Sequence, residues 1–205
     1  HELQRLVREL TTLFGIGKVV ISVTDQRALF DKIVEGGVSV TEADLGWLLL
    51  RDDQRKNYCL VAQKNLPVGG TARLDQPWDD GISSLVALSG EPLAIHGDAL
   101  RRFKVARFGQ AVLIAPLKVR KEVVGLLVMV RSAMTPFGPA QQALLEAVAD
   151  YASISLMNAR LFKALEERAH TLQRSADTAQ LNQMIIGETL QKASQELSKP
   201  LSAVS

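Results

Sequence analysis

The chain has 205 residues, of which 47% are hydrophobic, and this is enough to bury the core of one domain of ordinary size. Its 24 basic and 22 acidic residues leave a net charge of +2, so there is no basic footprint for nucleic acid or for an anionic membrane. A single cysteine, Cys59, excludes an internal disulfide, and no apolar run approaches the ~20 residues that span a bilayer. We therefore expect a cytoplasmic protein without membrane insertion and, because the chain starts at His1 rather than methionine, a piece of a longer protein.

Two helices are expected first. The first carries a narrow apolar stripe, typical of a helix that pairs with another helix. The stripe consists of Leu3, Leu6, Leu10 and Leu13. The second helix begins at Thr24 or Asp25, and its apolar face consists of Leu29, Phe30, Ile33 and Val34. The pair Gly36-Gly37 is expected to end it.

Two hairpins and an irregular segment follow. Apolar runs separated by short polar turns predict strand pairs at 47–51 with 57–63 and at 111–118 with 122–131. Between the hairpins we expect a loop over 64–76, a short helix opened by Asp80 or Gly81 and closed by Gly90, a strand at 93–95 and a helical turn at 98–103. Antiparallel hairpins with helices at both ends, able to cover one face, indicate an α+β architecture.

The last element is a helix from Pro139 to about Lys199, because proline is accepted in a first turn and nothing later stops the helix. Its length, about 92 Å at 1.5 Å per residue, is typical of a coiled coil. Apolar, small or amide side chains alternate at steps of three and four: Phe162, Leu165, Ala169, Leu172, Ala176, Ala179, Gln183, Ile186, Leu190, Ala193 and Leu197. This stripe is weak in its middle, around Ala176–Gln183. Beyond Leu161 no remaining sequence can cover it, so a second chain is the natural partner.

Four segments in this order resemble a GAF domain. They are Ala43–Leu50, Asp80–Ile95, Ala115–Val130 and Phe137–Leu145, which look like the first strand, the Gly-Ile-x-x-x-Val-Ala segment, the final hairpin and the start of the last helix of that family. The resemblance implies a GAF/PAS-like central antiparallel sheet with helices on one face. On the other face it implies a pocket that holds a small molecule in some members only. It also implies dimerisation through terminal helices.

The chain end resembles a second family. The run Ala193–Val204 looks like the phosphoacceptor box of sensor histidine kinases, but Gln195 stands where that family has its histidine. An amide nitrogen is too weak a nucleophile to accept a phosphoryl group. If the alignment is right, this is a degenerate dimerisation helix without a catalytic residue.

Candidate ligand contacts are Trp78, Asp80, His96 and Phe103, near the pocket that the resemblance implies. Each also has a simpler interpretation: Asp80 as a helix cap, His96 as an exposed loop residue. The basic run Arg101, Arg102, Lys104 and Arg107 can hold a phosphate or simply be solvated. We expect Trp47 and Cys59 to be core residues. The sequence implies no metal site and no cofactor.

These observations predict a helix at 1–12, a GAF domain at 13–161 and a coiled coil at 162–205 leading into a kinase-like dimerisation helix. We expect a homodimer joined by Leu3, Leu6, Leu10, Leu13, Leu165, Leu172, Ile186, Leu190 and Leu197. The expected function is a sensory relay module of a two-component signalling protein, not an enzyme by itself. The alternatives are a fragment of an active histidine kinase with Gln195 in place of its histidine, and a ligand-free GAF domain that only dimerises.

Overall fold

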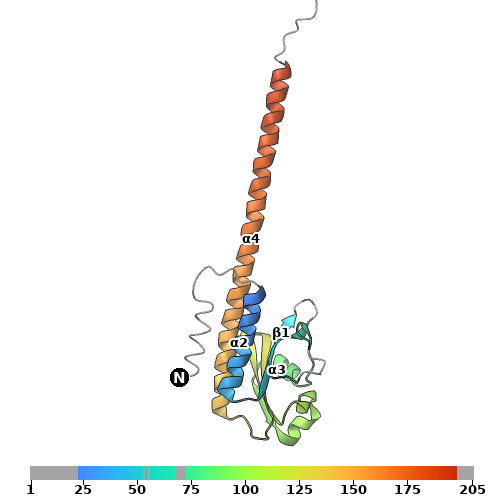
Figure 1. Ribbon diagram of the computed structural model, residues 1–205, viewed down its shortest axis with the longest axis vertical. Coiled ribbons are helices and arrows are strands. Elements are labelled where there is room, and N and C mark those ends of the chain that lie inside the picture. Colours follow the sequence, from blue (N-terminus) through green and yellow to red (C-terminus); the bar gives the residue numbers. More distant parts are fainter. Residues whose placement is uncertain (1–22, 53, 55, 68–72, 198–205) are drawn as a thin grey trace, which may run out of the picture. The chain divides into compact units, whose positions relative to one another are not determined.

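The computed structural model describes residues 23–52, 54, 56–67 and 73–197 (Figure 1). The expected first helix, with Leu3, Leu6, Leu10 and Leu13, lies outside the described residues. The elements are α2 (Val23–Thr41), β1 (Leu45–Asp52), β2 (Asn57–Lys64), β3 (Gln76–Pro77), α3 (Ser83–Ser89), β4 (Leu93–His96), η1 (Gly97–Arg102), η2 (Lys104–Arg107), β5 (Ala111–Val119), β6 (Glu122–Arg131) and α4 (Pro139–Leu197). Contacts divide the chain into two units, His1–Ala159 and Arg160–Ser205.

The first unit is built on a six-stranded antiparallel sheet with the strand order β3-β2-β1-β6-β5-β4. Both expected hairpins, β1–β2 and β5–β6, are confirmed. The second hairpin turns tightly through Arg120 and Lys121, whose φ angles are 50° and 73°. Two consecutive residues with positive φ give the turn twist that matches the twist of the flanking strands.

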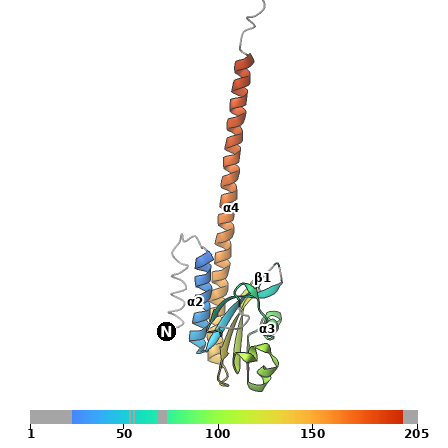
Figure 2. The same ribbon diagram turned by 45° about the vertical axis from the view of Figure 1, so that its right-hand side comes forward.

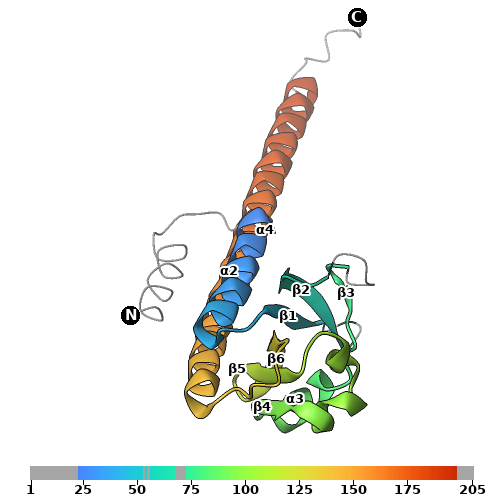
Figure 3. The same ribbon diagram turned by 60° about the horizontal axis from the view of Figure 1, so that its bottom comes forward.

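Successive residues of the central strands point to opposite faces of the sheet, and both faces are buried. On one face Leu48, Leu127 and Met129 pack in a cluster with α2 and with the first part of α4. On the other face Trp47, Leu49 and their neighbours pack against α3, η1 and η2. Figures 2 and 3 show α2 and α4 on one side of the sheet and α3 on the other. Burial on both faces explains the nearly continuous apolar sequences of β5 and β6.

The prediction that Gly36-Gly37 ends the second helix is wrong, because α2 continues to Thr41. A Cβ on Gly37 would lie 2.6 Å from Cε of Met129, so glycine lets the helix approach β6 closely. The helix ends instead at Thr41, and the next residue, Glu42, has a φ of 54°. Here the packing of the helix on the sheet outweighs the local cost of two glycines, about 1 kcal/mol each.

The second unit is described as one helix, the part of α4 from Arg160 to Leu197. All its side chains described, to Glu196, are exposed, including the large apolar Phe162, Leu165, Leu172, Ile186 and Leu190. Exposed apolar side chains at such a spacing are typical of an assembly surface. No helix among the described residues is long and apolar enough to cross a membrane.

Candidate functional site

Three aromatic side chains meet on the face of the sheet opposite α2 and α4, and we name Trp47, Trp78 and Phe108 the aromatic cluster. Trp47 lies on β1, Trp78 follows β3, and Phe108 follows η2. The ring centroids of Trp47 lie 5.6 Å from Trp78 and 5.5 Å from Phe108 in edge-to-face geometry, and Trp78 stacks on Phe108 at 5.9 Å. These are the arrangements that the quadrupoles of aromatic rings favour.

The indole nitrogens of the cluster lack acceptors. Nε1 of Trp47 and Nε1 of Trp78 are both buried, and neither has a hydrogen-bond partner among the described residues. Leaving a buried N–H donor unpaired costs about 1–3 kcal/mol, so proteins usually satisfy such groups with their own atoms, water or a ligand. This cluster therefore combines three rings that pack against one another with two buried N–H donors that have no partner among the described residues.

The Asp79-Asp80 pair holds the segment that carries Trp78. The buried Asp80 carboxylate accepts hydrogen bonds from the backbone N–H groups of Ile82 and Ser83 and from the Ser83 hydroxyl, at 3.1, 2.8 and 2.6 Å. The backbone N–H of Val105 also donates to the Asp80 carbonyl at 2.9 Å. These bonds hold the start of α3, whose N-cap residue is Ile82 rather than Asp80, and fasten it to η2.

Asp79 is exposed and forms an ion pair with Lys104 of η2. The hydrogen bond from Lys104, followed by one from the backbone N–H of Gly81, lowers the pKa of the Asp79 carboxyl. This pair therefore adds a second, solvent-exposed tie between the Trp78 segment and η2.

The structure separates the four residues expected to contact a ligand. Trp78 and Phe103 both pack on the core of this face, and the buried Asp80 lies between Trp78 and α3. His96 ends the sheet-edge strand β4, where it is exposed and lies opposite Ala111. His96 is therefore not part of the aromatic cluster.

Three of the four basic side chains at 101–107 already contact an acidic or aromatic neighbour. Arg101 pairs with Asp98 at 3.2 Å, Lys104 pairs with Asp79, and the guanidinium of Arg107 stacks over Phe108 with 4.6 Å to the ring centroid. A phosphate ligand would have to compete with these partners. Among the described residues no group of three His, Cys, Asp or Glu side chains could hold a metal ion.

Sequence reasoning assigned Trp47 to the core and did not single out Phe108. Trp47 is indeed fully buried, at 0% exposure, but its unpaired N–H makes it a site candidate as well. Aromatic residues make up only 5% of the chain. Their scarcity was the one signal that could have suggested a shared site for both tryptophans and a phenylalanine.

On the opposite side of the sheet, Arg131 joins three elements at the end of β6. Its guanidinium donates to the carbonyl of Thr41, the last residue of α2, at 2.8 Å. It also reaches the carbonyls of Thr135 and Pro136, at 3.3 and 3.4 Å, and stacks over Phe137 just before α4. A cation at a helix C-terminus stabilises its free carbonyls. The start of α4 is thus tied to α2 and to the sheet.

A sheet of this order, helices on one face and an irregular segment enclosing an aromatic face define the class of small α+β sensory-type folds. Residues 23–157 match the family model of the GAF domain, and the chain belongs to the GAF family. No protein of curated description matches it in sequence.

Solved structures agree with this fold. The GAF domain of a phosphoenolpyruvate-protein phosphotransferase from Coxiella burnetii has a TM-score of 0.63 and 19% identity, covering 80% of this chain and 97% of that chain. The corresponding Acinetobacter domain has a TM-score of 0.61 and 20% identity, covering 78% and 93%. The GAF domain of a putative sensor histidine kinase from Pseudomonas syringae pv. tomato has a TM-score of 0.53 and 19% identity, covering 81% and 92%.

Proposed function

We propose that this chain is a sensory relay module of a two-component-type signalling protein of the cytoplasm. In this proposal, an event at the aromatic face changes the packing of the first unit. The change is passed to α4 and along a parallel dimeric coiled coil to an output domain outside this chain. The chain contributes no catalytic residue.

The single observation that carries the proposal is the double role of α4. Its first part supplies core side chains of the sheet domain, among them Leu145, Val148, Ala152 and Leu156. The same helix continues from Arg160 with every described side chain exposed and large apolar residues at heptad spacing. A shift of the helix within the core can therefore be passed to the exposed stripe, since both belong to one continuous helix.

The middle of the stripe is suited to switching. Ala176, Ala179 and Gln183 supply little apolar surface there. Three hydroxyl side chains in the same region, Thr171, Ser175 and Thr178, donate back to carbonyls four residues earlier, at 2.8, 3.0 and 2.8 Å. Such back-bonding slightly weakens and bends a helix. Two packings of the coil can then lie close in free energy, which a relay requires.

The ligand, in this proposal, is a planar molecule with a hydrogen-bond acceptor. The unpaired Nε1 groups of Trp47 and Trp78 are donors, and the rings that carry them pack edge to face with 5.6 Å between their centroids. No cofactor is required. The putative histidine kinase from Pseudomonas syringae pv. tomato carries a GAF domain of the same fold, which supports a comparable setting for this chain.

The kinase-like box at the end of α4 remains part of the proposal. Gln195 is an exposed residue of the helix, at the position where the phosphoacceptor histidine would stand. Because an amide cannot accept a phosphoryl group, we expect the box to serve dimerisation only. Incubation of the chain with a purified histidine-kinase catalytic domain and ATP should leave it unlabelled, and labelling would contradict this role.

Native mass spectrometry of freshly purified chain tests the proposal. We expect a dimer, and extra mass on it would identify a retained ligand. A monomer at micromolar concentration would overturn the coiled-coil relay. A dimer of bare polypeptide mass would favour the alternative of a ligand-free dimerisation domain. Candidate ligands can then be titrated by fluorescence, because both tryptophans of the chain lie in the aromatic cluster. A ligand at this site should lose affinity in Trp78→Phe, which keeps an aromatic ring but removes the N–H donor.

A further inference from the structure

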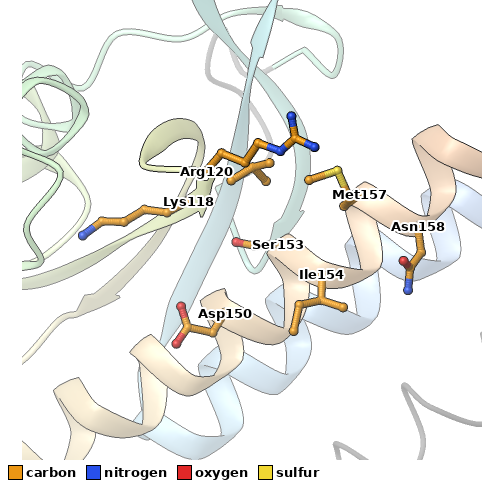
Figure 4. Close-up of a pocket in the computed structure, with 8 residues that line it drawn as sticks. Lys118, Arg120, Asp150, Ser153, Ile154, Met157 and Asn158 are labelled. Carbon is orange, nitrogen blue, oxygen red and sulfur yellow. The ribbon is translucent and has the colours of Figure 1, made fainter.

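A groove lies between the turn of the β5–β6 hairpin and the first part of α4, and its volume is about 430 Å³. One wall consists of residues 118–120 of the hairpin, and the other consists of side chains from residues 150–158 of α4. We name it the α4 groove. Figure 4 shows its lining residues, all of which belong to the first unit and none to the aromatic cluster. A volume of this size is typical of a small-molecule site, so the groove is a second, separate candidate site.

The α4 groove carries opposite charges at its two ends. The Asp150 carboxylate lies at one end, and the Arg120 guanidinium lies on the side of Met157 at the other (Figure 4). Asp150 and Met157 are seven positions apart on α4, a separation of about 10 Å at 1.5 Å per residue. Among the described residues neither charged group has an ionic or hydrogen-bonded partner. Lys118, on the same wall as Arg120, already pairs with Glu91 at 3.6 Å.

The backbone holds Arg120 at this rim in a conformation that arginine rarely adopts. Its φ is 50°, in a tight hairpin turn where asparagine and glycine are the preferred residues. A long charged side chain at such a position is a costly choice for the turn alone. Backbone strain of this kind is a reason to look for a function of the residue.

The centre of the α4 groove is apolar. Val119 and Met157 are half-buried, and Ile154 is 60% exposed. An exposed branched side chain gains free energy when a ligand covers it, because apolar surface is then removed from water. The groove therefore offers an apolar floor between a carboxylate and a guanidinium.

Two uncharged polar side chains complete the α4 wall. Ser153 is buried, and its hydroxyl donates to the Ala149 carbonyl at 2.8 Å, which leaves the hydroxyl oxygen able to accept a hydrogen bond. Asn158 is exposed, and its amide can both donate and accept. The N–H and C=O groups of a peptide bond need partners of this kind when they leave water. The wall therefore suits a ligand that contains peptide bonds.

We infer that the α4 groove binds a short apolar peptide with free ends. The terminal ammonium group of the peptide pairs with Asp150, its terminal carboxylate pairs with Arg120, and its side chains cover Ile154. About three extended residues, at 3.3–3.6 Å each, span the roughly 10 Å between the two charges. An internal segment of a protein has no terminal charges and leaves Asp150 and Arg120 unpaired, so the charges favour a free peptide. The inference does not depend on the relay proposed above.

NMR of the full chain, labelled with carbon-13 at the methionine methyl groups, tests the inference. The chain has four methionines, of which Met157 lines the groove. Met129 is a core residue, whereas Met134 and Met184 are 52% and 64% exposed and lie outside the groove. The chain is titrated with the tripeptide alanyl-leucyl-alanine, and Met157→Leu identifies the Met157 signal.

We expect the Met157 signal to shift and to saturate with a Kd on the order of 0.1–1 mM, while the signals of Met134 and Met184 stay in place. A Met157 signal that does not move with about 10 mM peptide would overturn the site. An equal shift of Met184 would also overturn it, since the peptide would then cover exposed apolar surface in general. If Met157 shifts only on dilution of the chain alone, a second copy occupies the groove and the inference is wrong.

Blocked peptides test the two ion pairs. Acetylation of the amino end and amidation of the carboxyl end should each weaken binding about fivefold, because each removes one exposed charge pair. Asp150→Asn should weaken binding of the free peptide by a similar factor and leave that of the acetylated peptide unchanged, and Arg120→Gln should do the same for the amidated peptide. Lys121→Gln is the matched control, because Lys121 belongs to the same turn but does not line the groove. Blocked peptides that bind as tightly as the free one would refute the pairing of the ends.

Discussion

Replacement of Arg131 by methionine should destabilise the first unit by about 2–3 kcal/mol. The bond to the Thr41 carbonyl, at 2.8 Å, is a charge-assisted hydrogen bond worth about 1.5–3 kcal/mol. Stacking of the guanidinium over Phe137, 4.4 Å from the ring centroid, adds about 0.5–1 kcal/mol. The other carbonyl contacts, at 3.3–3.4 Å, are too long to add much.

Urea unfolding followed by tryptophan fluorescence measures this effect, because both tryptophans report on the first unit. With a slope of about 2–3 kcal/mol per M, the midpoint should fall by about 1 M. The urea midpoint of Arg131→Lys should lie between those of the parent and of Arg131→Met, since an ammonium group reaches fewer carbonyls than a guanidinium.

Arg101→Met is the matched control, because both side chains of its ion pair with Asp98 are highly exposed. Equal midpoints for Arg131→Met and Arg101→Met would refute the view that Arg131 fastens α2, β6 and α4 together. They would also mean that the contacts of Arg131 with Thr135, Pro136 and Phe137 do not hold the start of α4 on the sheet.

Three further predictions follow from close contacts and charge. Gly125→Ala places a Cβ 2.8 Å from the Leu49 carbonyl of the neighbouring strand and should cost about 1–3 kcal/mol in urea unfolding. Gly138→Ala, with nothing within 4 Å, should change stability by less than about 0.5 kcal/mol, and similar losses in both would contradict the packing. Gly187→Ala meets no atom within 4 Å and should stabilise α4 by about 1 kcal/mol in thermal unfolding followed by circular dichroism; a loss would mean that glycine is needed for a close approach in the dimer. Lys104→Met should raise the pKa of Asp79 toward its usual value in a carbon-13 NMR titration. The stability that this lowered pKa provides is present above the pKa of the unfolded state, about 4, and is lost as the pH falls through the folded value. The variant and the parent should therefore converge in stability in acid, and a difference that grows on acidification would show that the ion pair has another role.

Local sequence patterns were sufficient for both hairpins and for the last helix, but not for the end of α2 or for the short strand β3. Alternating apolar runs with short polar turns predicted both hairpins, and proline followed by an uninterrupted 3–4 repeat predicted α4. These features depend on neighbours within a few residues along the chain, where side-chain periodicity and turn chemistry act directly. The family resemblance supplied the arrangement of these elements.

Local sequence patterns predicted the members of the candidate site less well. Trp78 was singled out, but His96 lies apart on an exposed strand end and Phe108 was missed. Sequence separation hides such neighbours, because β1, the segment after β3 and the segment after η2 meet only when the sheet is assembled. The unpaired indole N–H groups are likewise a property of the packed state and have no sequence signature.

By itself, then, the sequence determined both hairpins, the α+β class and an apolar stripe on the last helix. Only the tertiary structure decided that Gly37 lies inside a helix. Glycine is needed there because α2 packs closely against Met129, and its own low helix propensity does not predict this. The same holds for the contacts of Arg131 with the Thr41 carbonyl and with the Phe137 ring. They arise where segments distant in sequence pack together, and long-range packing is the contribution that local propensity does not contain.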